Sequence, residues 1–118
     1  LTNLDFAKLG LLLLNKGKWQ EKQIISAEWI AQMLTKRLDI SEVDPFANHY
    51  GYFWYLASNE FNGTTFDYAF ASGNGGNKLY IIPQKNMVIS IQSSAYGRGY
   101  GHGRSNFLFE SILKAIEQ

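Results

Sequence analysis

Apolar residues recur along the chain with two different periods. Near the start, Leu4, Ala7, Leu11 and Leu14 follow the spacing of one helix face, and leucines at positions 9, 12 and 13 fill the other sides. From about residue 50 the apolar residues instead alternate or form short runs rich in aromatic and β-branched side chains, which is typical of strands. A helical stripe returns at positions 108, 112, 115 and 116. The chain therefore begins and ends in helices, with strands between them.

Capping and turn residues set the expected boundaries of these elements. Ser26 can cap the second helix, Ser105 or Asn106 can cap the last one, and Pro83 opens a four-residue connection between two strands. The predicted helices cover residues 3–15, 27–36 and 106–117, and the predicted strands cover about 50–57, 66–72, 78–82 and 87–93. This order indicates an α+β domain in which an antiparallel sheet of three to four strands is flanked by helices.

Composition narrows the classes of function. The 118 residues suit one domain, and 46% hydrophobic with 15% aromatic residues exclude a disordered chain. The net charge is +1 without a basic run, so we expect no nucleic-acid partner. The absence of cysteine excludes disulfides and thiolate metal sites, and the longest apolar run, residues 11–14, is too short to cross a bilayer.

The apolar pattern of the first helix predicts that further segments of a longer protein cover it. A helix that is apolar on nearly every side requires burial on nearly every side, which 118 residues can hardly provide. The chain also begins at Leu1 in structured sequence without a signal peptide. We expect residues 1–118 to be a single domain from the carboxy-terminal part of a longer protein. Its first partner would be the missing amino-terminal helical region, and the chain alone would self-associate.

Five short blocks, in order, resemble the β-lactamase-like serine hydrolases. This group includes class C β-lactamases, penicillin-binding proteins, related esterases and 6-aminohexanoate-dimer hydrolases. The blocks are FAKLGLLLLNKGKW (6–19), IISAEWI (24–30), YGYFW (50–54), ASGNGGN (71–77) and IPQKNMV (82–88). Each block is weak alone, but together they cover most of the chain. The resemblance implies the carboxy-terminal portion of a β-lactamase/transpeptidase-like fold.

The resemblance also implies a site. In the family, a Lys-Thr-Gly or His-x-Gly triplet on a strand precedes a residue whose backbone N–H stabilises the oxyanion. Asn74 would supply that amide, and the residues expected to line the substrate are Ala71, Ser72, Gly73, Gly75 and Gly76. The glycines would allow close approach of the substrate and the turn into the next strand. Taken alone, this segment favours a plain loop between strands, and the flanking blocks reverse that preference.

Departures from the family pattern change the expected activity. A correctly placed Ser-x-x-Lys nucleophile and a Tyr-x-Asn are absent, so we expect this chain alone to be inactive. Ala71 stands where the family has Lys or His, which favours an ester or amide over a β-lactam as the small-molecule substrate of the complete protein. The alternative is a degenerate hydrolase domain that acts as a non-catalytic binding or structural module. We expect no cofactor and no metal. Only the resemblance favours a bacterial periplasm or cell envelope.

Three other motifs carry less weight. Ser111-Ile112-Leu113-Lys114 matches Ser-x-x-Lys, but it falls late in the chain and off the apolar stripe, as a surface coincidence would. The glycine spacing of residues 97–104 fits no nucleotide loop, so a mobile surface connection is favoured over an anion- or nucleotide-binding loop. His49 and His102 lack the spacing of zinc ligands and are expected in loops.

Overall fold

The structure, a computed structural model, describes residues 1–116 as three helices, one short ribbon and one larger sheet. The helices are α1 (Asn3–Leu14), α2 (Ala27–Met33) and α3 (Gly101–Ile116). The ribbon pairs β1 (Lys18–Trp19) with β2 (Lys22–Gln23). The sheet contains β3 (Leu38–Asp39), β4 (His49–Tyr50), β5 (Tyr55–Phe61), β6 (Thr64–Gly73), β7 (Asn77–Ile82) and β8 (Met87–Ile91), with a 3₁₀ turn, η1 (Pro83–Lys85), before β8.

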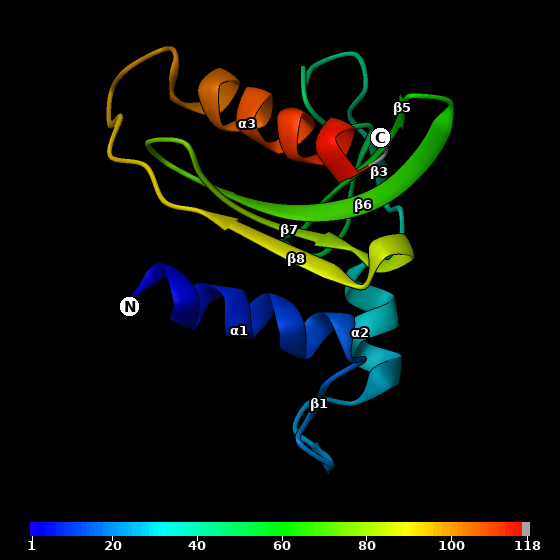
Figure 1. The fold of residues 1–118 in the computed structure, drawn as a ribbon. Helices are drawn as coiled ribbons and strands as arrows, with labels where there is room; N and C mark the ends of the chain where they lie inside the picture. Colours follow the sequence, from blue (N-terminus) through cyan, green and yellow to red (C-terminus); the bar gives the residue numbers. More distant parts are fainter. Residues whose placement is uncertain (117–118) are drawn as a thin grey trace.

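The larger sheet is antiparallel throughout and its strands lie in chain order, from β3 at one edge to β8 at the other. Helix α3 crosses one face of this sheet and α1 packs under the other, against β7 and β8 (Figure 1). The register between β6 and β7 pairs Ser72 with Lys78 and Gly73 with Asn77. Residues 71–78 are therefore a hairpin end, held between the two helical layers.

Side chains of the sheet divide between two cores because successive strand residues point to opposite faces. On the α3 face, Tyr80 stacks on Phe109 with ring centroids 3.7 Å apart, and Phe70 lies in the same cluster. On the α1 face, Leu79 and Ile81 pack in a second cluster with α1 and α2. Every second residue of β7 thus belongs to the same core, so residue 78 shares the α3 face with residues 80 and 82.

The predicted fold class is confirmed, but the sheet has more strands than expected and several boundaries differ. Residues 50–57 are not one strand, because the chain turns between β4 and β5. There a Cβ on Gly51 would lie 2.3 Å from the Met33 carbonyl oxygen, and Phe53 has φ +65°. Helix α2 ends at Met33 and not at 36, and α3 begins at Gly101 and not at 106. The predicted helix end at 117 lies outside the described residues.

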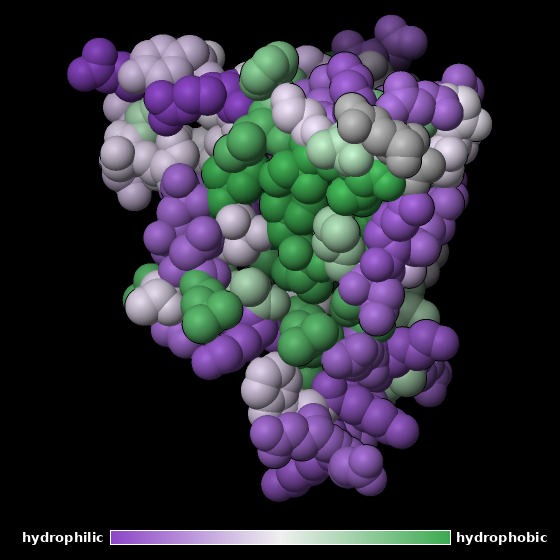
Figure 2. Space-filling model, viewed as in Figure 1, coloured by the Kyte–Doolittle hydropathy of each residue, from purple (hydrophilic) through white to green (hydrophobic). Residues whose placement is uncertain are grey.

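Apolar side chains remain uncovered on both helical layers. Leu13 is buried, but Leu4 and Leu9 are 69% and 48% exposed, and Phe107 on α3 is 72% exposed. Figure 2 shows apolar surface gathered over α3 and β8, on the side where β8 forms the free edge of the sheet. Among the described residues, no helix is long and apolar enough to cross a membrane.

Candidate functional site

The turn between β6 and β7 has a conformation that its glycines make accessible. Asn74, Gly75 and Gly76 connect the paired residues Gly73 and Asn77, and φ is +90° at Gly75 and +91° at Gly76. A Cβ on Gly76 would also lie 2.4 Å from the carbonyl oxygen of Gly101, at the start of α3. Because no other residue type tolerates both conditions, the turn and the helix start can touch through their backbones.

Hydrogen bonds from two other segments fix the same turn. The Asn77 side chain donates to the Asn74 carbonyl at 2.8 Å and accepts from the Ser93 amide at 3.0 Å. The buried Ser105 hydroxyl, in α3, donates to the Gly76 carbonyl at 2.6 Å. The segment after β8 and the first turns of α3 therefore hold the turn in one orientation.

The backbone amide of Asn74 lies at the end of β6, one residue beyond the ladder. It donates to no residue of the part of the chain that the structure describes, and the Asn74 side chain is exposed. A free N–H in a rigid turn has a direction that is fixed before any ligand arrives. Such a donor stabilises developing negative charge without reorganisation.

A cluster of three polar side chains lies beside this turn on the α3 face. Lys78 is only 5% exposed, and its Nζ donates a hydrogen bond to the Ser72 hydroxyl at 2.8 Å. Nδ1 of His102, in the first turn of α3, lies 3.5 Å from the same hydroxyl. Ser72 itself is exposed, so the hydroxyl connects a buried amine with the surface.

The electrostatics of the cluster follow from the burial of Lys78. Burial removes the ammonium group from water and lowers the pKa of Lys78 to about 8, and Asp44 opposes this shift. Burial and the charge of Lys78 both lower the pKa of His102. No carboxylate of residues 1–116 lies within 4.0 Å of Lys78 Nζ. The site therefore contains a buried cation that has a hydroxyl partner and, among residues 1–116, no carboxylate in contact with it.

The side chains of the predicted site residues do not all lie on the same face of the sheet. Ser72, Gly73 and Asn74 end β6 as expected, but Ala71 packs against the cluster on the α1 face, away from the Ser72 side chain. The prediction missed Lys78 and placed both histidines in loops, whereas His49 lies in β4 and His102 in α3. The strand pattern could have predicted the burial of Lys78. Residues 78, 80 and 82 alternate along β7, so the lysine lies on the same buried face as the apolar residues 80 and 82.

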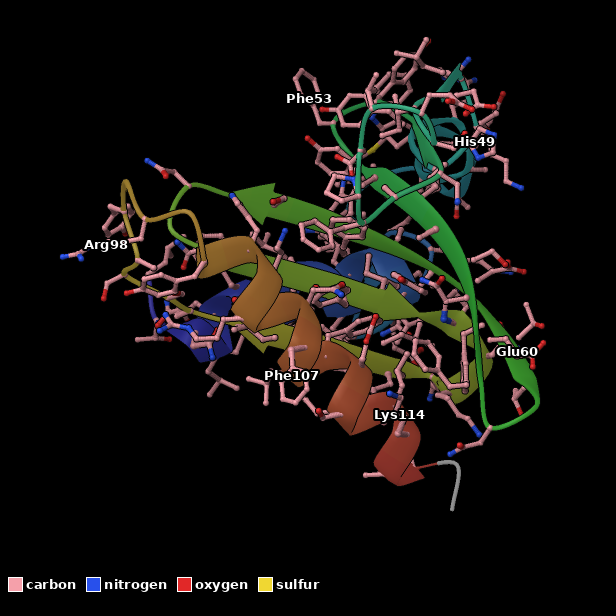
Figure 3. The ribbon with its side chains drawn as sticks, turned by 90° about the horizontal axis from the view of Figure 1, so that it is seen from above. His49, Phe53, Glu60, Arg98, Phe107 and Lys114 are labelled. Atoms are coloured by element: carbon pink, nitrogen blue, oxygen red, sulfur yellow. The ribbon has the colours of Figure 1, made fainter. Side chains whose placement is uncertain are left out.

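The discounted motifs lie away from this cluster. Ser111 and Lys114 are exposed, and the Ser111 hydroxyl donates to the Phe107 carbonyl of its own helix at 2.8 Å. Figure 3 shows Lys114 near the far end of α3 and Arg98 pointing outward from the preceding loop. The Arg104 guanidinium donates a hydrogen bond to the Ser93 hydroxyl oxygen at 2.9 Å. Within residues 1–116, no group of three His, Cys, Asp or Glu side chains is placed to hold a metal ion.

One groove lies away from this turn. It has a volume of about 560 Å³ and opens beside the C-terminal end of α2, over a floor that includes Leu56, Ala69 and Ile81. Its lining contains His49 and Asp67 but none of the three residues of the polar cluster. Its floor is therefore formed by apolar side chains of the sheet, on a different part of the molecule from the polar cluster.

Comparison with known proteins supports the fold. Neither a family model nor a curated protein matches the sequence. Solved structures do match. One from Bacillus anthracis, assigned as a 6-aminohexanoate-dimer hydrolase, superposes with a TM-score of 0.68 at 24% sequence identity. The match covers 98% of this chain and 29% of the other, longer chain. The chain thus has the architecture of part of a β-lactamase-like fold.

Proposed function

We propose that this chain forms one wall of the active site of a serine hydrolase, which acts by acyl transfer on an ester, an amide or a β-lactam. The free backbone amide of Asn74, fixed at the end of β6, is the observation that carries the proposal. Ser72 and Gly73 would lie along the substrate, and Gly75 and Gly76 would shape the turn. The resemblance of the five sequence blocks and the fold of the matched structure support this assignment.

The proposed chemistry requires a nucleophile from outside the 118 residues. The oxygen of that serine attacks the carbonyl carbon of the substrate, and the carbonyl oxygen takes the negative charge. The Asn74 amide donates to this oxygen until the leaving group departs, and again when water releases the acyl group. One donor of this kind contributes about 2.7–4 kcal/mol to stabilisation of the transition state.

Three features favour a larger parent protein. The matched structure is longer, since this chain covers 29% of it. Strand β8 has a free edge, and Leu4 and Leu9 of α1 are exposed. Unpaired strand edges and exposed apolar helix faces are normally covered by another segment.

Residue 71 bears on the substrate. Because Ala71 packs in the apolar cluster on the α1 face, no cation projects from that position, which favours esters and amides over β-lactams.

Labelling with a fluorophosphonate probe tests this assignment. The 118-residue chain should remain unlabelled, and the full product of its gene should gain one label on a serine outside these residues. Ser111→Ala, in the Ser-x-x-Lys match of α3, serves as the control and should leave that label in place. Stoichiometric labelling of the chain alone would contradict the proposal. A full gene product that takes no label would favour the alternative, a degenerate domain that binds without catalysis.

A further inference from the structure

Phe53 is held in a backbone conformation that its side chain does not favour. Its φ is +65°, in the left-handed region where a bulky side chain is strained. The other non-glycine residues of 1–116 with a positive φ are asparagines or have long polar side chains, so Phe53 is the aromatic exception. Strain of this kind persists only where the surrounding structure fixes it, and it often marks a functional position.

Hydrogen bonds and packing on both sides of Phe53 fix this conformation. The Gly51 amide donates to the Trp54 carbonyl at 2.8 Å, and the Tyr52 amide donates to the Met33 carbonyl, at the end of α2, at 3.0 Å. The Trp54 side chain is buried in the core on the α1 face. The turn between β4 and β5 is therefore anchored, and the direction of the Phe53 side chain is set in advance.

Packing does not explain why a phenylalanine stands at this position. The side chain of Phe53 is 85% exposed and belongs to neither core cluster. Its neighbour Tyr52, in contrast, stacks on Trp29 with ring centroids 5.9 Å apart and lies under the Arg37 guanidinium. Figure 3 shows the Phe53 side chain projecting away from the ribbon. A strained and exposed aromatic residue that gains no packing is instead explained by contact with a ligand.

The sheet places Phe53 beside an open strand edge. The ladder between β5 and β6 ends at Phe70 of β6, whereas the ladder between β6 and β7 continues to Gly73. Residues 71–73 are thus paired with β7 and, within residues 1–116, have no backbone partner on their other side. Phe53 precedes the first residue of β5, Tyr55, by two positions, so it lies where the next rungs of the β5–β6 ladder would fall.

We propose that Phe53 contacts the acyl group of the substrate and selects acyl groups that are apolar. The inference rests on the proposed function, in which the substrate lies along Ser72 and Gly73 and its carbonyl oxygen binds the Asn74 amide. About 7 Å, the rise of two strand residues, separates residue 74 from residue 72, and an acyl chain of several carbons spans that distance. An alkyl or aryl group at the open edge then buries the exposed face of the Phe53 ring. The substrate is thus an ester or amide of an apolar acid.

Two replacements of Phe53 separate the strain from the contact. Phe53→Gly removes the ring and relieves the left-handed strain, so the melting temperature of the full gene product should stay the same or rise. Phe53→Ala removes the ring but keeps the strain, so it should melt below Phe53→Gly. A melting temperature of Phe53→Gly below that of the wild type would overturn the proposal, because it would show that the ring packs against another part of the longer protein.

Hydrolysis of p-nitrophenyl octanoate and p-nitrophenyl acetate by the full gene product measures the selectivity. The ratio of the two kcat/KM values, octanoate over acetate, should fall by about tenfold or more in Phe53→Gly and in Phe53→Ala, and Phe53→Trp should retain it. Phe107→Ala removes another exposed ring, from α3, and should leave the ratio unchanged. An unchanged ratio in Phe53→Gly and Phe53→Ala would overturn the proposal.

A binding measurement distinguishes this inference from the proposed function. Octanamide is added to the full gene product with labelled phenylalanine rings, and nuclear magnetic resonance follows the Phe53 signals. We expect these signals to shift saturably, and Phe53→Gly to weaken the binding by about tenfold. Binding needs no nucleophile, so binding that depends on Phe53 in a product without a fluorophosphonate label would support the contact and contradict the proposed function. Labelling on a serine combined with octanamide binding that does not depend on Phe53 would overturn the contact alone.

Discussion

Lys78 and Ser72 are cross-strand partners whose side chains meet on the α3 face of the sheet, with Nζ donating to the hydroxyl oxygen at 2.8 Å. The pairing places a cation at an inward position of β7, in step with Tyr80 of the core. The hydroxyl satisfies one donor of the amine and leaves its charge without a counter-ion. Residues kept at a cost to stability often serve function.

The first prediction concerns that cost. Lys78→Met should leave the free energy of unfolding at pH 7 unchanged or higher, because a buried cation without an anion is replaced by an apolar side chain of similar length. Lys114→Met, on the exposed surface, should stay within about 0.5 kcal/mol of the wild type. Urea unfolding at pH 7 measures all three proteins. A large loss of stability in Lys78→Met would show that the amine is a structural support.

The pH dependence of the same pair is a second prediction. The pKa of Lys78 is about 8 in the folded chain and near the ordinary value of 10.5 when unfolded, so between these values the unfolded state binds more protons. Wild-type stability should therefore rise relative to Lys78→Met as the pH increases from about 8 to 10.5. Groups that do not interact with Lys78 cancel in the comparison, and His102, whose pKa is lowered by burial and by the charge of Lys78, titrates below this window. A difference that stays flat across this window would contradict the burial of a charged amine.

The contact between the turn and α3 gives a third prediction. Gly76→Ala should destabilise the fold by about 3 kcal/mol, since the methyl group meets the Gly101 carbonyl and φ is +91°. Gly63→Ala is a matched control, because Gly63 has φ +83° but no atom within 4 Å of the added Cβ. It should cost only the backbone strain, about 1–2 kcal/mol. Equal melting temperatures for the two variants would contradict the close approach of Gly76 and Gly101.

The hydroxyl that holds the turn from α3 gives a fourth prediction. Ser105→Ala leaves the buried Gly76 carbonyl without its donor and should cost about 1–3 kcal/mol of unfolding free energy. Ser111→Ala removes an exposed hydroxyl from the same helix, where it donates to the Phe107 carbonyl, and should stay within about 0.5 kcal/mol. Chemical unfolding distinguishes the two. Similar losses in both variants would mean that helix propensity, and not the bond to the turn, sets the effect.

The uncovered leucines of α1 give a fifth prediction. Alone, the chain should self-associate and bind a hydrophobic dye, and replacement of Leu4 and Leu9 by lysine should reduce both. Val43→Lys changes an exposed apolar side chain in a loop, 82% exposed, and should have no effect. Sedimentation and dye fluorescence provide the measurements. A monomer that binds no dye would count against a missing covering segment.

Sequence periodicity predicted the elements that local patterns specify. The helices, the β7–β8 connection and the glycine turn after β6 all follow from spacing, caps and turn residues. The start of α3 at Gly101 did not, because glycine disfavours helices and the close approach of Gly101 to Gly75 and Gly76 depends on the tertiary fold. The β4–β5 break was missed for the same reason, since Gly51 packs against the distant Met33 carbonyl.

The sequence predicted only the part of the candidate site whose residues are contiguous in the chain. Residues 72–74 are contiguous, so their position at a strand end could be inferred from the sequence. The approach of Lys78 and His102 to Ser72 depends on strand register and on the placement of α3, which no local pattern encodes. The pKa of about 8 for Lys78 likewise arises from burial in the assembled core.

In the proposed function, the backbone amide of Asn74, and not its side chain, stabilises the oxyanion. The direct measurement is the rate of fluorophosphonate labelling of the full gene product for two variants of this residue that retain the fold by circular dichroism. Asn74→Pro removes the N–H and should slow labelling by about 10²–10³-fold, whereas Asn74→Ala keeps the N–H and should label at nearly the wild-type rate. A normal rate in Asn74→Pro, or an equal loss in both variants, would contradict the account.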